Sequence, residues 1–89
     1  MKDKRSFHIV LYGRPGCHLC EQVEAHIRRL EQEFSLRLQL VNIESDPQLH
    51  ERYMLTIPVV AIDGEDVFLS VNAVVTEEEL RQELRRRSH

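Results

Sequence analysis

The sequence is poor in several residue types, and its few cysteines and lack of long apolar runs each exclude a class of protein. Its 89 residues contain no tryptophan, three glycines, three prolines and two cysteines. Two cysteines cannot build the disulfide framework of a small secreted domain, so any role they have is local chemistry. No apolar run approaches the roughly 20 residues that a membrane-spanning helix needs. We find no internal repeat and no low-complexity linker.

The sequence also lacks an excess of basic residues. It carries 12 Lys plus Arg against 15 Asp plus Glu, a formal net charge of −3. A dedicated nucleic-acid binder needs a clear basic excess for its phosphate contacts, so we expect no nucleic-acid partner. The arginines at 81 and 85–87 suit a helix C-terminus, where positive charge complements the helix dipole.

Length and composition predict one globular domain over residues 1–89. The chain is 42% hydrophobic and 30% charged, which is typical of a folded domain, and it leaves no room for a second core. The charged start of the chain, Met1 to Arg5, does not have the pattern of a signal peptide. We therefore expect a cytoplasmic monomer without a membrane partner, in a compartment that disfavours stable structural disulfides.

Strand and helix patterns alternate in the first half. Residues 7–12 form a short apolar run that predicts a buried strand, and residues 17–34 carry apolar side chains at helical spacing. In residues 36–43 the apolar side chains alternate and then change phase. This pattern predicts a second strand with a bulge or a phase slip near its end.

The second half continues with shorter elements. Asp46 followed by Pro47 predicts a helix start, and Asp63-Gly64 predicts a hairpin turn between strands at 57–62 and 67–71. Thr76 and a glutamate three residues later predict a capped final helix. The order is β-α-β-α-β-β-α. A parallel pair from the first β-α-β unit and an antiparallel hairpin give a small mixed sheet flanked by helices, an α/β fold.

The two cysteines lie where the first strand passes into the first helix. Cys17 would be the cap or a first-turn residue of the helix, and Cys20 would lie on the same helical face within disulfide range. Unpaired N–H groups and the helix dipole favour a thiolate at this position and lower its pKa. We therefore predict that Cys17 is the exposed nucleophile and that Cys20 is the shielded resolving thiol.

The neighbouring residues leave alternatives open. Arg14 supplies a positive charge and Gly16 leaves space for a partner backbone, whereas His18 either tunes the thiolates or is a neutral surface residue. Half of a zinc site is another interpretation of the cysteines, but two further ligands at suitable spacing are lacking, so we expect no metal. Two buried structural cysteines are a third interpretation, which a strand-to-helix turn disfavours.

Thr56-Ile57-Pro58 is a second motif, at the start of a predicted strand. A cis proline would turn the chain while the strand continues, and would leave the backbone of Ile57 free to pair with an extended partner. A trans proline at the first residue of an edge strand is the ordinary alternative.

With these two motifs, nearly the whole chain resembles a glutaredoxin of the thioredoxin-like superfamily. Arg14 stands three residues before the first cysteine, and Thr56-Ile57-Pro58 matches the family's Thr-Val-Pro. The resemblance implies a thioredoxin-like (glutaredoxin) fold with sheet order 2-1-3-4 and a cis Pro58. The substrate-binding residues predicted on these grounds are Arg14, Gly16, His18, Thr56, Ile57 and Pro58.

The sequence departs from the glutaredoxin pattern at two places. His18-Leu19 replaces the usual Pro-Tyr between the cysteines, which is similar to a subgroup with a Pro-Gly-Cys-x-Leu-Cys centre. The Gly-Gly-x-Asp motif that holds glutathione in the family would fall on residues 68–71, where Phe-Leu-Ser-Val stands instead. The family's charge clamp for glutathione is therefore missing.

The predicted function is thiol–disulfide exchange through Cys17 and Cys20. The partner would be a disulfide-containing protein or glutathione, with glutathione a possible co-substrate and no resident cofactor. Two alternatives remain: an adaptor with little turnover that docks through the apolar residues 68–71, and an iron–sulfur or metal-binding glutaredoxin-like module.

Overall fold

The computed structural model describes residues 5–88. Its elements, in chain order, are β1 (Ser6–Gly13), α1 (His18–Leu30), β2 (Ser35–Asn42), the 3-10 helix η1 (Ile43–Ser45), α2 (Pro47–Tyr53), β3 (Val59–Ile62), β4 (Glu65–Phe68) and α3 (Glu77–Arg86).

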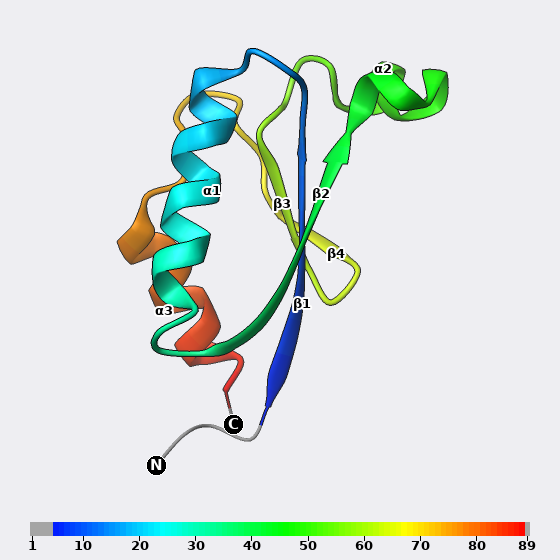
Figure 1. Ribbon diagram of the computed structural model, residues 1–89. Helices are drawn as coiled ribbons and strands as arrows, with labels where there is room; N and C mark the ends of the chain where they lie inside the picture. Colours follow the sequence, from blue (N-terminus) through cyan, green and yellow to red (C-terminus); the bar gives the residue numbers. More distant parts are fainter. Residues whose placement is uncertain (1–4, 89) are drawn as a thin grey trace.

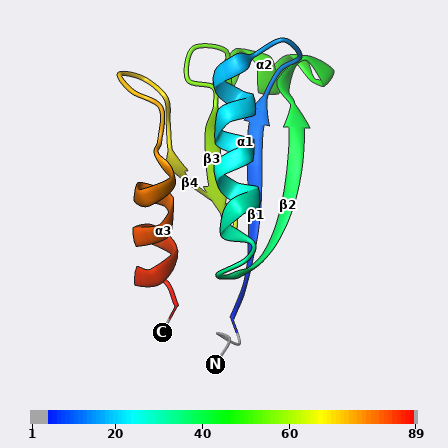
Figure 2. The same ribbon diagram turned by 60° about the vertical axis from the view of Figure 1, so that its left-hand side comes forward.

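The four strands form one mixed sheet in the order β2-β1-β3-β4. β1 pairs in parallel with β2, and β3 pairs antiparallel with both β1 and β4. Figure 1 shows α1 and α3 on one side of this sheet and α2 on the other, and Figure 2 shows α1 in front of the strands. The predicted α/β architecture and its strand order are confirmed.

Alternation along β1 explains the two apolar clusters. Phe7, Ile9 and Leu11 are buried against the cluster under α1 and α3, because successive side chains of a strand point to opposite faces. On the other face Tyr12 packs with a smaller cluster built around Ile43, Tyr53 and Val59. β3 is buried on both faces, as its unbroken apolar run predicts.

Of the two explanations predicted for the phase change in the second strand, a bulge or a phase slip, the bulge is wrong. β2 pairs with β1 in continuous register from Ser35 to Asn42. Leu36 and Leu38 pack against the cluster under α1 and α3, whereas Ile43 follows the strand and belongs to the opposite cluster. The change of phase marks a change of sheet face. The register shift in this sheet lies instead between β3 and β4, at Val60/Ala61.

Several predicted boundaries also move. α1 ends at Leu30, four residues before Phe34, whose ring packs edge-on against Phe7 with centroids 6.5 Å apart. β3 begins after Pro58, which has no N–H to offer a ladder, and β4 ends at Phe68.

The capping predictions for α2 and α3 are confirmed. Asp46 caps α2 with Pro47 in its first turn. Thr76 and Glu79 form the reciprocal capping box of α3. Among the described residues, no helix is both long enough and apolar enough to cross a membrane.

Candidate active site

The two cysteines meet at the N-terminus of α1. Cys17 is the N-cap residue, and Cys17 and Cys20 are joined in a disulfide with their Cα atoms 5.3 Å apart. Cys20 is only 7% exposed, whereas Cys17 is half-buried. Cys17 is therefore the more accessible of the two cysteines, and Cys20 is the shielded one.

A backbone N–H points at the accessible sulfur. The amide of Cys20 donates to Sγ of Cys17 over 3.1 Å. In the reduced protein, a donor in this position and the positive end of the helix dipole favour the thiolate of Cys17.

Gly13 is a site residue that the sequence analysis missed. It is the last residue of β1, and a Cβ added to it would lie 2.9 Å from Sγ of Cys20 and 3.1 Å from its Cβ. Only glycine leaves room for the shielded cysteine against the strand. The sequence shows a glycine after an apolar run, which also suits an ordinary strand end and so gives no specific signal.

Three predicted substrate-binding residues lie around Cys17 on the exposed turn and the first turn of α1. Gly16 has a φ of 77°, and a Cβ there would meet no atom within 4 Å, so the approach beside Cys17 is open. The side chain of His18 is 91% exposed, with Nδ1 3.6 Å from Oε1 of Glu21. Arg14 is exposed. Their predicted roles in binding stay predictions.

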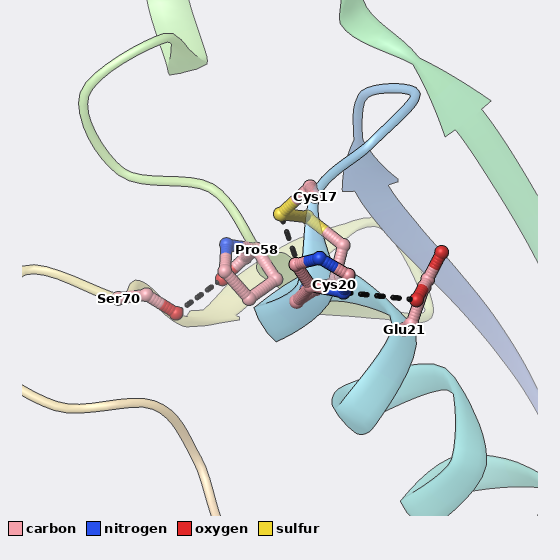
Figure 3. Close-up of a disulfide and its surroundings, with 6 residues drawn as sticks. Cys17, Cys20, Glu21, Pro58 and Ser70 are labelled. Carbon is pink, nitrogen blue, oxygen red and sulfur yellow. Dashed lines mark hydrogen bonds and ion pairs between the residues drawn. A yellow bond between two sulfur atoms is a disulfide. The ribbon is translucent and has the colours of Figure 1, made fainter.

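Pro58 lies beside the disulfide although it is distant from the cysteines in the sequence. It is buried, its peptide bond with Ile57 is cis, and Figure 3 shows it beside Cys17 and Cys20. The expected free backbone of Ile57 needs correction, because its N–H donates to the carbonyl of Tyr53 over 3.1 Å. The carbonyl of Ile57 accepts no backbone bond from residues 5–88 and could accept one from an extended partner.

Ser70 anchors this loop and was also missed. Its hydroxyl donates to the carbonyl of Pro58 over 2.6 Å, and its N–H donates to the carbonyl of Thr56 over 2.9 Å. Figure 3 shows the first of these bonds on the side of Pro58 away from the cysteines. Residues 68–71 are apolar except for Ser70, and a single serine in an apolar segment gives no specific signal in the sequence.

Tyr53 supports the same loop from α2. Its ring stacks on Tyr12 with centroids 4.3 Å apart, and its hydroxyl donates to Oδ2 of Asp66 over 2.9 Å. Burial, followed by the bond to Asp66, raises the pKa of Tyr53 to about 12, so this hydroxyl stays protonated at neutral pH. Its carbonyl accepts the N–H groups of both Thr56 and Ile57.

A groove of about 250 Å³ opens beside the disulfide. It is lined by Leu11, Gly13, Arg14, Pro15, Cys17, Cys20, Glu21, Glu24, Leu40, Val41 and Asn42. These residues come from the ends of β1 and β2, the turn after β1 and the first half of α1.

Donors for a metal ion are sparse around the cysteines. Within residues 5–88, no group of three or more His, Cys, Asp or Glu side chains is placed to hold a metal ion. A structural zinc site takes four protein ligands, and this site offers two sulfurs.

The comparisons with known proteins agree with this geometry. A family model described as glutaredoxin-like domain (DUF836) matches residues 8–85. No curated protein matches the chain.

Solved structures of similar fold include the solution structure of protein Ne2328 from Nitrosomonas europaea. It is 28% identical, with 89% of this chain and 92% of that chain covered and a TM-score of 0.70. A mutant thioredoxin from Halobacterium salinarum is 16% identical, with 98% of this chain and 79% of that chain covered and a TM-score of 0.71.

A mutant of the thioredoxin-like protein BC3987 is 24% identical, with 86% of this chain and 94% of that chain covered and a TM-score of 0.60. The family match spans most of the chain, and these neighbours share its fold. The chain belongs to the glutaredoxin-like domain family and has the thioredoxin-like fold.

Proposed function

We propose that the protein is a thiol–disulfide oxidoreductase that works through Cys17 and Cys20. The observation that carries the proposal is the pairing of an accessible sulfur at a helix N-terminus with a shielded sulfur at bonding distance, beside Pro58. A purely structural pair would have no need for one partly exposed sulfur at an N-terminus, where the thiolate is favoured.

The exchange begins with the reduced protein. The Cys17 thiolate attacks one sulfur of a partner disulfide and forms a mixed disulfide, and the partner's other sulfur leaves as a thiolate and takes up a proton. Cys20 then loses its proton and attacks Sγ of Cys17, which releases the partner's second thiol. The partner gains two electrons, and Cys17 and Cys20 lose two as their disulfide forms.

The disulfide form of the protein is the product of these two exchange steps. An external thiol returns it to the dithiol by the same two exchange steps in reverse. The open side of Gly16 and the carbonyl of Ile57 are where the partner backbone would approach, with Arg14, His18, Thr56 and Pro58 around it.

Serine substitutions at the two cysteines test the division of roles. Cys17→Ser removes the attacking sulfur and is expected to abolish reduction of a peptide disulfide, with dithiothreitol excluded from the assay. Cys20→Ser removes the resolving sulfur and is expected to accumulate a mixed disulfide with the peptide, seen as a mass shift that a reductant reverses.

Two results would contradict the proposal. One is a Cys17→Ser variant that still reduces the peptide at the wild-type rate. The other is a Cys20→Ser variant that forms no mixed disulfide while Cys17→Ser does, which would exchange the roles of the two cysteines.

A further inference from the structure

The groove beside the disulfide lies on the opposite side from Pro58. β2 borders β1 on one edge and β3, which follows Pro58, borders it on the other. The groove is lined from β1, β2 and α1. In Figure 3, Glu21 from the groove and Pro58 lie on opposite sides of the cysteine pair. A partner bound to Cys17 could therefore place one neighbouring residue on each side of the reacting sulfur.

The groove suits a single large apolar side chain. Leu11, Leu40, Val41 and Pro15 form much of its wall, and the side chain of Leu40 leaves an apolar surface open, with half of the residue exposed. An engineered apolar cavity of about 150 Å³ is already large enough to bind benzene. A groove of about 250 Å³ therefore has room for an aromatic or branched aliphatic side chain.

The charges around the groove disfavour an anionic ligand. Its lining contains two carboxylates, Glu21 and Glu24, against one guanidinium, Arg14. Glu24 is held by Arg28, whose Nε lies 2.9 Å from its Oε2. Glutathione disulfide is an anion at neutral pH, and the lining of the groove offers it more carboxylates than guanidinium groups.

The opposite side of the disulfide offers few spare donors for such an anion. The hydroxyl and the N–H of Ser70 and the N–H of Ile57 already donate to backbone carbonyls of the protein. The residues flanking Ser70, Leu69 and Val71, are exposed and apolar. A glutathione moiety has two carboxylates, and its recognition on this side would need hydrogen-bond donors that already bind backbone carbonyls of the protein.

We propose that the groove binds the aromatic or aliphatic side chain next to the reacting cysteine of a protein disulfide, and that such disulfides are preferred over glutathione disulfide. This inference rests on the proposed function, because the ligand is the chain that exchanges with Cys17. Leu40 and the adjacent groove wall would then determine which disulfide is preferred.

A matched set of peptide disulfides tests the preference. The set has Phe, Gly or Glu next to the cysteine, with glutathione disulfide as a fourth substrate, and the reduced protein is the reductant. We expect the second-order rate constant to be at least about tenfold higher for the Phe peptide than for the Gly peptide, since a single methylene group in an apolar pocket is already worth about 10-fold or more. The Glu peptide and glutathione disulfide are expected to react more slowly than the Gly peptide.

Two leucines with nearly equal exposure supply the variants. Leu40 lines the groove and is 50% exposed, whereas Leu69 follows β4 and is 49% exposed. Leu40→Ser is expected to bring the Phe-to-Gly rate ratio close to one, while Leu40→Met keeps the apolar wall and the ratio. Leu69→Ser is expected to leave the ratio unchanged.

The outcomes separate this inference from the function on which it rests. Equal rates for the Phe and Gly peptides, or a ratio that falls in Leu69→Ser and not in Leu40→Ser, would overturn the inference and leave exchange itself intact. Faster reduction of glutathione disulfide than of the Phe peptide would also overturn it. Failure to reduce any of the four substrates would refute the proposed function and the inference together.

Discussion

Gly13 is a residue whose missing side chain makes the site possible. A methyl group there would come within 2.9 Å of the sulfur of Cys20, closer than ordinary contact allows. The strand and the helix would have to move apart, or Cys20 would have to leave its buried place. Overpacking of this kind typically costs about 1–3 kcal/mol.

Gly13→Ala is therefore expected to lower the free energy of unfolding by about that amount, measured by urea denaturation of the reduced protein. The double variant with Cys20→Ala is the control, because it removes the sulfur that the new methyl group would meet. The cost of Gly13→Ala should shrink in that background. An equal cost in both backgrounds would mean that the clash with Cys20 is not the cause.

Ser70 tests whether the Pro58 loop must be held in place. Ser70→Ala removes the hydroxyl bond to the Pro58 carbonyl, and we expect a loss of about 1 kcal/mol in stability together with a lower rate of disulfide reduction.

Ser88→Ala is the matched control, since its hydroxyl also donates 2.6 Å to a backbone carbonyl, that of Leu84, at the end of α3. It should lose similar stability and keep the wild-type rate of reduction. Equal rates in both variants would contradict a positioning role for Ser70.

At the scale of elements, α3 is tied to α1 by a network of ion pairs. Arg81 contacts Glu33, Glu77 and Glu78, and Arg29 of α1 also reaches Glu77. The hydrogen bond from Arg81 lowers the pKa of Glu33, and the hydrogen bond from Arg29 lowers the pKa of Glu77. Charges from both helices thus meet where α3 packs on α1.

Because the pKa values of these glutamates are lowered by folding, the stability of the folded protein depends on pH. A glutamate whose pKa is lower in the folded protein stabilises it above its unfolded value of about 4.3, and that contribution disappears as the pH falls through the folded pKa. We expect Tm to drop between pH 6 and pH 3.

The Arg81→Met variant should show a smaller drop in Tm over the same range, because it removes the cation that lowers the pKa of Glu33. Arg37→Met, a substitution of an exposed arginine on β2, serves as the control and should keep the wild-type pH dependence. A wild-type drop that Arg81→Met leaves unchanged would show that these ion pairs are not its origin.

At the scale of the whole molecule, the fold could be predicted where local signals and long-range packing agree. Three local signals each fix an element: the short apolar run of residues 7–12, the capping box at Thr76 and the position of Cys17 before a helical pattern. The order of these elements then leaves few topologies, since β-α-β crossovers are right-handed.

What could not be predicted depends on contacts between distant residues. The phase change before Ile43 is the same in sequence whether the strand bulges or the chain moves to the other sheet face. The bond from Ser70 to Pro58 joins the residue before β3 to the segment after β4, and the closeness of Gly13 to Cys20 appears only when α1 packs on β1. No local pattern carries these facts.

The difference in reactivity between the two thiols is the claim on which the functional account depends. Its most direct test is alkylation of the fully reduced protein by iodoacetamide at pH 7, with each cysteine followed by mass spectrometry. The account predicts that Cys17 is modified at least tenfold faster than Cys20, because it is more exposed and faces an N–H donor. Equal rates, or faster modification of Cys20, would contradict it.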